Sequence, residues 1–335
     1  TTLFYGPLSD AFGRRRVLLA GLGIYVASSL AAAAATSIEA LYLARIGQGL
    51  SASAGLVLGR AILRDMYTGP AAQKAMSSVM MLFALAPAVA PIIGGWLHEW
   101  AGWRSVFLFL AGLGVLLWIM VYSAMEETLP VRHRMEARIR PALALYARAL
   151  RHRRFMALVL MIALNFAGSF LYIAAAPVLL YEHLGLGAGQ FGYLFLPLVA
   201  GVILGAFASG RLADRAKPAV TARAGMVIMA GAAGVNLVQS LVVTPSIPWV
   251  VAPVAFYAFG VSIAMPALSL MALECFPHNR GLASAAQSFV QTFGNALVAG
   301  VLVPIVAVAV PGMAMSMVLL LMASVVMGAV LIGRR

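Results

Sequence analysis

The sequence has little charge and almost no cysteine. Charged residues make up 10% of its 335 residues, whereas about 25% is usual in soluble domains. A chain so poor in charge cannot cover a globule with polar surface. Its single cysteine, Cys275, excludes a disulfide framework and a metal site built from several thiolates. With a hydrophobic content of 63%, these absences indicate a polytopic membrane protein and exclude a soluble enzyme.

Recognisable catalytic motifs are also absent. The sequence contains no H-E-x-x-H, no Walker A loop and no G-x-S-x-G, and its five histidines lie in loops or at the ends of apolar runs. We therefore expect no enzymatic activity, no metal site and no cofactor. Without a phosphate-binding loop, an ion gradient is a better candidate than ATP hydrolysis as the energy source.

The apolar runs predict an all-α polytopic fold with ten membrane-spanning helices, since about 20 helical residues cross the hydrocarbon core. The expected spans are residues 17–36, 40–63, 74–97, 103–124, 155–178, 189–210, 221–243, 248–272, 283–308 and 312–333.

The positive charge is strongly one-sided. When the predicted loops are assigned alternately to the two sides, every lysine and arginine except Arg45 and Arg104 falls on the same side. Positively charged short loops are retained inside, so this side is expected to be cytoplasmic. The net charge of +13 then reflects topology, and no nucleic-acid partner is expected.

A polar stretch at residues 125–154 divides the spans into four before it and six after it. We expect a helical bundle at residues 1–124, a basic cytoplasmic linker at 125–154 and a second helical bundle at 155–335. From Pro141 onward the linker resembles a short basic amphipathic helix on the inner leaflet, acting either as a solvated connection or as a lipid sensor.

An internal repeat relates the two parts. GPLSDAFGRRR begins at Gly6, GRLADRAKP begins at Gly210, and their aspartates, Asp10 and Asp214, are 204 residues apart. Two spans separate the linker from Gly210, but only five residues precede Gly6. On a two-fold repeat the sequence is expected to lack about 50 residues, comprising helix 1 and most of helix 2 of a twelve-span protein.

Several motifs resemble those of the major facilitator superfamily. GPLSDAFGRRR is similar to its loop between helices 2 and 3, LYLARIGQG at residues 41–49 to its helix 4 motif, and LAPAVAPIIGG at 85–95 to the helix 5 motif of drug:proton antiporters. DMY at residues 65–67, FAGSFLYIAAAP and FPHNRGLASA resemble the Bcr/CflA group of bacterial drug exporters.

The resemblance implies a fold of two six-helix bundles and a specific activity. A monomer in the bacterial inner membrane, with both termini of the full protein cytoplasmic, would exchange protons for drug-like small molecules. It also implies proton-linked acidic residues on helix 1. The open alternatives are a metabolite or amino-acid exporter on the same fold and a non-transporting membrane sensor or scaffold. Small-molecule substrates, protons and membrane lipids are the expected partners.

Arg45 is the cation expected at membrane depth. Burying an arginine costs about 2.5 to 3.5 kcal/mol even on the translocon scale, so Arg45 should have a partner. Every acid of the sequence falls at a predicted membrane surface, so the expected partner is an acid on the absent first helix. Arg45 would then control protonation and substrate occupancy there, unless it only bonds carbonyls or extends to the surface. Gln48, one turn away, would orient Arg45 or line the cavity.

Two polar stripes at helical spacing are expected to face a central substrate cavity, or else to form interhelical hydrogen bonds. They consist of Asn165, Ser169 and Tyr172, and of Gln287, Gln291 and Asn295. The pairs Gly55/Gly59 and Gly201/Gly205 predict close helix packing.

The remaining candidates concern conformational change. The repeated loops would stabilise one access state through ion pairs and helix capping, or would simply be solvated. Their candidate residues are Gly6, Asp10, Gly13, Arg14, Arg15, Asp214 and Arg215. Prolines and glycines in one span would kink it and admit a close neighbour, and the resemblance adds a role in antiport. These are Pro87, Pro91, Gly94 and Gly95.

Overall fold

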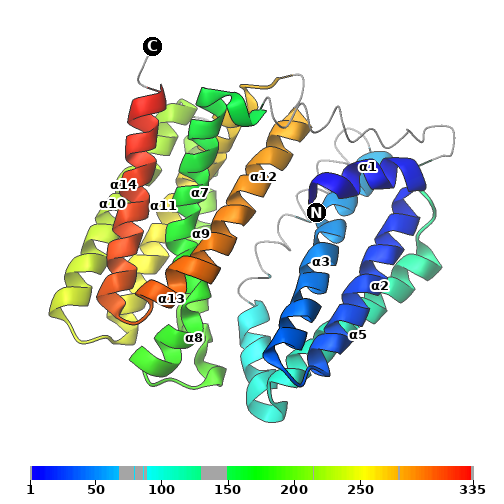
Figure 1. Ribbon diagram of the computed structural model, residues 1–335. Helices are drawn as coiled ribbons and strands as arrows, with labels where there is room; N and C mark the ends of the chain where they lie inside the picture. Colours follow the sequence, from blue (N-terminus) through cyan, green and yellow to red (C-terminus); the bar gives the residue numbers. More distant parts are fainter. Residues whose placement is uncertain are drawn as a thin grey trace. The chain divides into compact units, whose positions relative to one another are not determined.

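The computed structural model describes residues 2–67, 79, 86, 89–129, 149–213, 215–277 and 280–332. These residues form helices and their connections, and no strand occurs among them (Figure 1). Within this part, nine helical segments are long and apolar enough to cross a membrane, which confirms the predicted all-α membrane fold. The predicted span at 74–97 and most of the linker at 125–154 lie outside the described residues.

The chain divides into two compact units. Unit 1 comprises residues 1–86 and 93–143, and unit 2 comprises residues 87–92 and 144–335. Each unit has its own hydrophobic cluster, and each is described separately below.

Unit 1 is built around α2. Its labelled helices are α1 (Thr2–Phe12), α2 (Arg14–Ala33), α3 (Ile38–Met66) and α5 (Trp103–Ala124). Helix α2 packs against both α3 and α5, while α1 packs across α2 and α3. Small residues allow these approaches: a Cβ on Gly21 would lie 2.8 Å from that of Ala54.

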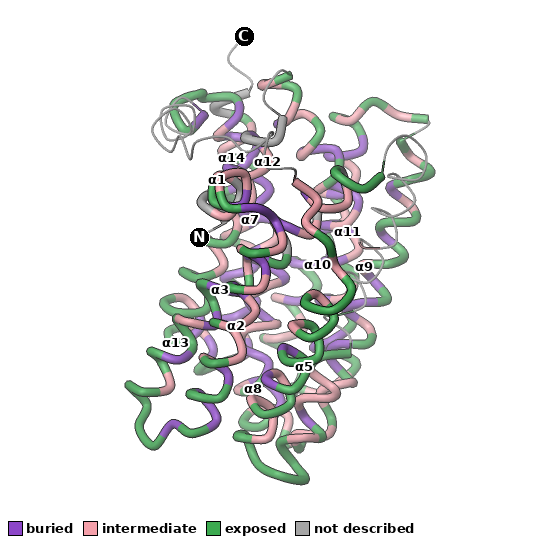
Figure 2. The backbone as a smooth tube through the Cα atoms, turned by 90° about the vertical axis from the view of Figure 1, so that its right-hand side faces the viewer, coloured by how far each residue is buried: buried purple, intermediate pink, exposed green. Residues whose placement is uncertain are grey.

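Unit 2 has a larger core centred on α7 and α11. Helix α7 (Arg153–Ala174) packs against α11 (Ile247–Leu273), α12 (Arg280–Leu297) and α14 (Val310–Ile332). Two thirds of the apolar stretch of α7 is buried, against about a tenth of α5 (Figure 2). The other long helices are α9 (Gly192–Ala213) and α10 (Pro218–Val242).

Short helical pieces complete unit 2. Helix α7 continues into α8 and a π-helical turn, and a second π-helical turn connects α12 to α13. Their bounds are α8 (Ala176–Val178), η2 (Leu179–His183), η3 (Ala188–Gln190), η4 (Val298–Leu302) and α13 (Val303–Val306).

Local sequence explains where the helices begin. The Ser37 hydroxyl accepts a hydrogen bond from the Ala40 amide at the start of α3, and His152 Nδ1 accepts one from the Phe155 amide at the start of α7. Pro218 occupies the first position of α10, where its missing N–H is not needed. Gly13 separates α1 from α2 with φ of +97°, a conformation that disfavours any side chain.

The glycine pairs have different roles. A Cβ on Gly201 or Gly205 would collide with backbone atoms of α11, so this pair forms the predicted close packing. A Cβ on Gly55 or Gly59 would have no described atom within 4 Å. Close packing at Gly55 and Gly59 against the described helices is therefore not seen, and packing there stays a prediction for the rest of the chain.

Candidate functional site

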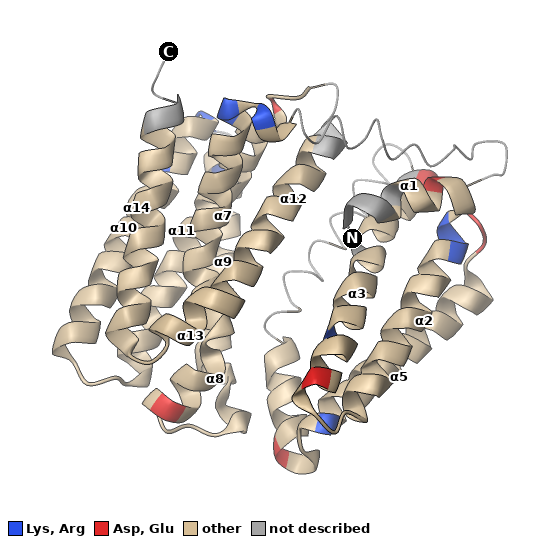
Figure 3. Cartoon of the chain, in the orientation of Figure 1, with Lys and Arg blue, Asp and Glu red and all other residues tan. Residues whose placement is uncertain are grey.

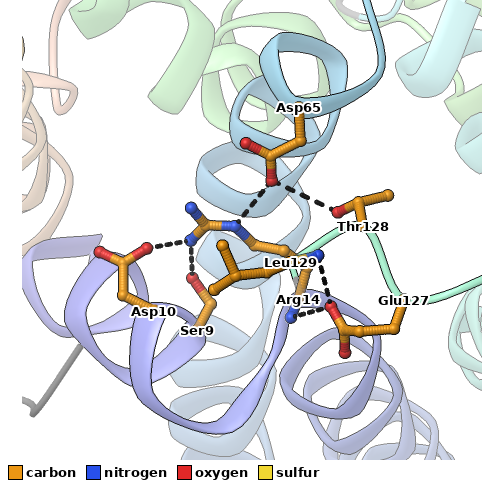
Figure 4. Close-up of polar contacts among 7 residues, drawn as sticks. All are labelled: Ser9, Asp10, Arg14, Asp65, Glu127, Thr128 and Leu129. Atoms are coloured by element: carbon orange, nitrogen blue, oxygen red, sulfur yellow. Dashed lines mark hydrogen bonds and ion pairs between the residues drawn. The ribbon is translucent and has the colours of Figure 1, made fainter. Parts of the chain in front are cut away.

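An arginine cluster lies where α1, α2 and α3 end or begin. Arg14 is the first residue of α2, directly after Gly13, and its side chain is 11% exposed. The chain changes direction at Gly13, and the Arg14 side chain extends toward Asp10 on α1 and Asp65 at the end of α3 (Figure 4). We define the arginine cluster as Ser9, Asp10, Arg14, Asp65, Glu127 and Thr128.

Arg14 binds two carboxylates from different helices (Figure 4). Its Nη1 lies 2.6 Å from Oδ1 of Asp10, one helical turn earlier in sequence, and also donates to the Ser9 hydroxyl. Its Nε lies 3.2 Å from Oδ2 of Asp65. Charge-assisted hydrogen bonds of this kind are about twice as strong as neutral ones, so Arg14 ties α1 and α3 to α2.

The segment after α5 completes the cluster. Glu127 Oε1 accepts hydrogen bonds from the amides of Arg14, at 2.8 Å, and Leu129, at 3.1 Å. The carboxylate thereby satisfies an amide at the positive N-terminus of α2. Thr128 donates to Oδ2 of Asp65 at 3.3 Å. The cluster therefore holds together three helices and the start of the segment that follows α5.

Arg15 adds a second connection between α2 and α5. Its Nη2 donates to the carbonyl oxygen of Tyr122 at 2.6 Å, and its guanidinium group lies 5.5 Å from the centre of the Tyr122 ring. The adjacent arginines of the repeat motif therefore have distinct contacts.

A second group of hydrogen-bonded polar side chains centres on the first half of α3. Arg45 Nη1 donates to Oε1 of Gln48 at 2.9 Å, and Gln48 Nε2 donates to the hydroxyl of Ser29 at 2.7 Å. The Ser29 hydroxyl donates in turn to the Tyr25 carbonyl oxygen. Gln48 and Ser29 are buried between α2 and α3, whereas Arg45 is exposed on the surface of unit 1. The expected orienting role of Gln48 thus has a geometric basis.

Arg45 has no carboxylate partner among the described residues. Its remaining contact is the ring of Phe107, whose centre lies 5.9 Å from the guanidinium carbon. The described acids lie toward the ends of helices or beyond them (Figure 3), and Glu39, in the first turn of α3, forms no ion pair with Arg45. Among the described residues, the contacts of the Arg45 guanidinium group are therefore with neutral groups.

The stripe of Asn165, Ser169 and Tyr172 lies inside unit 2. All three are buried, and the Tyr172 hydroxyl accepts a hydrogen bond of 2.6 Å from Asn236 on α10. The hydrogen-bonding alternative therefore applies to Tyr172, whose partner belongs to the same unit. That Asn165 and Ser169 face a central substrate cavity stays a prediction.

The α12 stripe is only partly buried. Gln287 accepts a hydrogen bond of 3.0 Å from Ser269 on α11. Gln291 and Asn295 are also partly buried and lie on the same helix.

The other predicted conformational residues are only partly described. Asp214 and Pro87 lie outside the described residues, while Arg215 is exposed just beyond α9. Pro91, Gly94 and Gly95 lie within a helical stretch at residues 89–101. Gly6 lies in α1.

Several residues of both sites were not singled out from sequence. Glu127 and Thr128 follow a span and belong to no pattern of helical spacing that would indicate a contact. Ser29 belongs to a stretch rich in small residues. Among the described residues, no group of three histidine, cysteine or acidic side chains could hold a metal ion.

The comparisons with known proteins agree on one family. Residues 1–299 match the family described as the Major Facilitator Superfamily. The chain is 33% identical over 285 residues to the uncharacterized MFS-type transporter YdgK of Bacillus subtilis, covering 84% of this chain and 71% of the relative. It is 30% identical over 304 residues to multidrug resistance protein D of Escherichia coli, covering 89% and 74%.

A solved structure shows the same fold. The human organic anion transporter MFSD10 (TETRAN) matches with a TM-score of 0.64 at 19% identity, over 97% of this chain and 79% of that one. At this identity the match shows the architecture alone.

Proposed function

The chain belongs to the Major Facilitator Superfamily, and we propose that it exports drug-like small molecules in exchange for protons. Members of this family are transporters and not enzymes. The proposed mechanism is alternating access, in which the two halves of the transporter open the substrate site to one side of the membrane at a time.

The series of hydrogen bonds from Arg45 through Gln48 to Ser29 is the observation that supports the proposal of proton coupling. Arg45 is eight residues into α3, which places it about 10 Å from the start of that helix. Its hydrogen-bonded neighbours are neutral, so its charge is available to a group that approaches from outside the described contacts. Gln48 is hydrogen-bonded to Ser29 and holds the Arg45 guanidinium group in position to interact with such a group.

A positive charge held in this way favours the ionised form of a nearby carboxyl group. Protonation of that carboxyl group weakens its attraction to Arg45, and binding of a substrate beside it changes its proton affinity. A proton and a substrate then compete for one site, which is the thermodynamic requirement for exchange.

The arginine cluster supplies the conformational part of the proposal. Its ion pairs connect α1, α2 and α3, and its hydrogen bonds join these helices to the segment after α5. We assign the cluster the role of a latch that stabilises one access state and must open for the other. Packed helix ends joined by discrete contacts favour two arrangements over a continuum.

The available energy matches this task. One proton crossing a membrane potential of about 150 mV releases roughly 3.5 kcal/mol. For a neutral solute exchanged for one proton, this supports a concentration gradient of a few hundredfold. The proposed location is the bacterial inner membrane, with the basic side of the protein in the cytoplasm and the protein acting as a monomer.

Drug-like substrates are proposed from the relatives. Multidrug resistance protein D of Escherichia coli is 30% identical to this chain, and its name concerns drug resistance. A metabolite or amino-acid exporter is the alternative on the same fold.

Reconstituted protein tests the proposal directly. Proteoliposomes carrying a pH-sensitive dye receive ethidium, chloramphenicol or a mixture of amino acids under an imposed pH gradient. Proton flux that depends on either drug supports the proposal, and flux only with amino acids favours the alternative. A protein that gives no substrate-dependent flux with any of these compounds, while correctly folded, would contradict exchange altogether.

A further inference from the structure

Unit 2 contains a cavity of about 610 Å³ that none of the proposed transport steps uses. It lies between α7, α10, α11 and α14, at the end of the unit where α7 and α10 begin and where α11 and α14 finish. Val325 and Ala329 on its rim are exposed, so the cavity opens onto the side of the unit. All of its lining residues belong to unit 2.

Two arginines line this cavity. Arg154 belongs to the first turn of α7, and Arg223 lies in the second turn of α10. Both are exposed, and neither forms an ion pair or hydrogen bond with another of the described residues. The lysines and arginines of unit 2 gather at this end of its helices (Figure 3). The cavity therefore has two arginines at its mouth that form no ion pair among the described residues, although Glu274, directly after α11, lies at the same end of the unit.

The lining becomes apolar with depth. Along α7, Leu158 and Met161 follow Arg154 by four and seven residues, or about 6 and 10 Å along the helix axis. On α10, Met226 lies one turn deeper than Arg223, and Leu268 on α11 is fully enclosed beside them. The positive charge thus lies at the level of the helix ends, and the methionine and leucine surfaces lie toward the membrane interior.

We infer that this cavity binds an anionic phospholipid from the leaflet that meets the basic helix ends. Its phosphate group binds Arg154 and Arg223, because one guanidinium group can donate two parallel hydrogen bonds to two phosphate oxygens. Its first acyl carbons lie along Met161, Met226 and Leu268. Basic pockets between membrane helices are suited to anionic headgroups, and methionine surfaces adapt to flexible chains.

The apolar depth distinguishes a lipid from a soluble anion. A free phosphate ion would use the two arginines and leave the methionine and leucine surfaces uncovered. A phospholipid uses both parts of the cavity, and the rim at Val325 and Ala329 lets its chains continue along the outside of the helices.

Lipid titration of the purified full chain tests this inference. Native mass spectrometry in neutral detergent compares phosphatidylglycerol with phosphatidylcholine of the same acyl chains. We expect the anionic lipid to bind more tightly than the neutral one. The double variant Arg154→Gln/Arg223→Gln should weaken binding of the anionic lipid about thirtyfold, from about fivefold for each hydrogen-bonded contact with the phosphate that is lost. The matched control Arg153→Gln/Lys217→Gln removes two charges from the same helix starts, outside the cavity, and should retain the affinity.

A second variant tests the cavity itself. Ala329→Phe fills the rim and leaves both arginines in place, so it should reduce binding of phosphatidylglycerol by blocking the path of its acyl chains. Glycerol 3-phosphate and inorganic phosphate, at millimolar concentration, should not displace the lipid. Displacement by either, equal loss in the control variant, or unchanged binding in Ala329→Phe would each overturn the inference. Because binding is measured without transport, its outcome is independent of the proposed exchange.

Discussion

The Nε atom of Arg14 lies 3.2 Å from Oδ2 of Asp65, so an ion pair joins the start of α2 to the end of α3. The side chains are 11% and 24% exposed, and water therefore replaces this contact poorly. Removing Asp65 would leave the largely buried Arg14 with a single carboxylate partner, Asp10. The two residues are 51 positions apart, and their pairing depends on the turn at Gly13.

Asp65→Asn should destabilise the protein by about 2 to 3 kcal/mol, because Arg14 loses a carboxylate and the neutral amide that replaces it carries no charge. Thermal unfolding in detergent measures the effect. Glu126→Gln is the matched control, since Glu126 is exposed beside the cluster. Equal unfolding temperatures for Asp65→Asn and the wild type would show that the pair contributes nothing.

Asp10→Asn should cost less stability than Asp65→Asn, although its ion pair is shorter. The Asp10 side chain is 42% exposed, and solvent screening limits such pairs to about 0 to 1 kcal/mol. Transport by Asp10→Asn should nevertheless fall if the cluster is a latch. Normal transport at normal expression would remove the latch role from Asp10.

Gly13→Ala should destabilise the protein by about 1 to 3 kcal/mol, because the φ of +97° and ψ of 147° at this position suit glycine almost exclusively. Gly49→Ala is the control in a helix, where an added Cβ would have no described atom within 4 Å. Alanine should be neutral or stabilising there. The prediction fails if both variants unfold at the same temperature.

Gly205→Ala and Gly59→Ala should differ although both change a glycine of a G-x-x-x-G pair. A Cβ on Gly205 would collide with the Phe259 carbonyl oxygen and lie 2.8 Å from the Ser262 Cβ, so α9 and α11 must separate at a cost of about 1 to 3 kcal/mol. A Cβ on Gly59 would have none of the described atoms within 4 Å. Comparable losses of folded protein on purification would contradict this distinction.

The sequence predicts the helices well because hydrophobic length and one-sided charge are local properties. The expected span at 103–124 coincides with α5, and most other described spans begin or end within three residues of the helix. The family is likewise predicted from short motifs such as GPLSDAFGRRR, and the match over residues 1–299 confirms it.

Side-chain orientation could not be predicted in the same way. Helical spacing shows that Asn165, Ser169 and Tyr172 share one face of α7, but it does not say which neighbour covers that face. Asn236, 64 residues beyond Tyr172, supplies the partner. The carboxylate of Glu127 similarly reaches Arg14 across 113 positions. Such contacts depend on how the helices pack, which periodicity does not specify.

Substrate-dependent proton flux in proteoliposomes, compared between the wild type and Arg45→Gln, tests whether Arg45 couples protons to substrate. Arg16→Gln, which removes an exposed charge from α2, controls for a general effect of charge. We expect ethidium or chloramphenicol to drive proton flux in the wild type and in Arg16→Gln, and Arg45→Gln to fall to the background of empty liposomes while remaining folded. Flux at the wild-type rate in Arg45→Gln would show that Arg45 has no part in coupling.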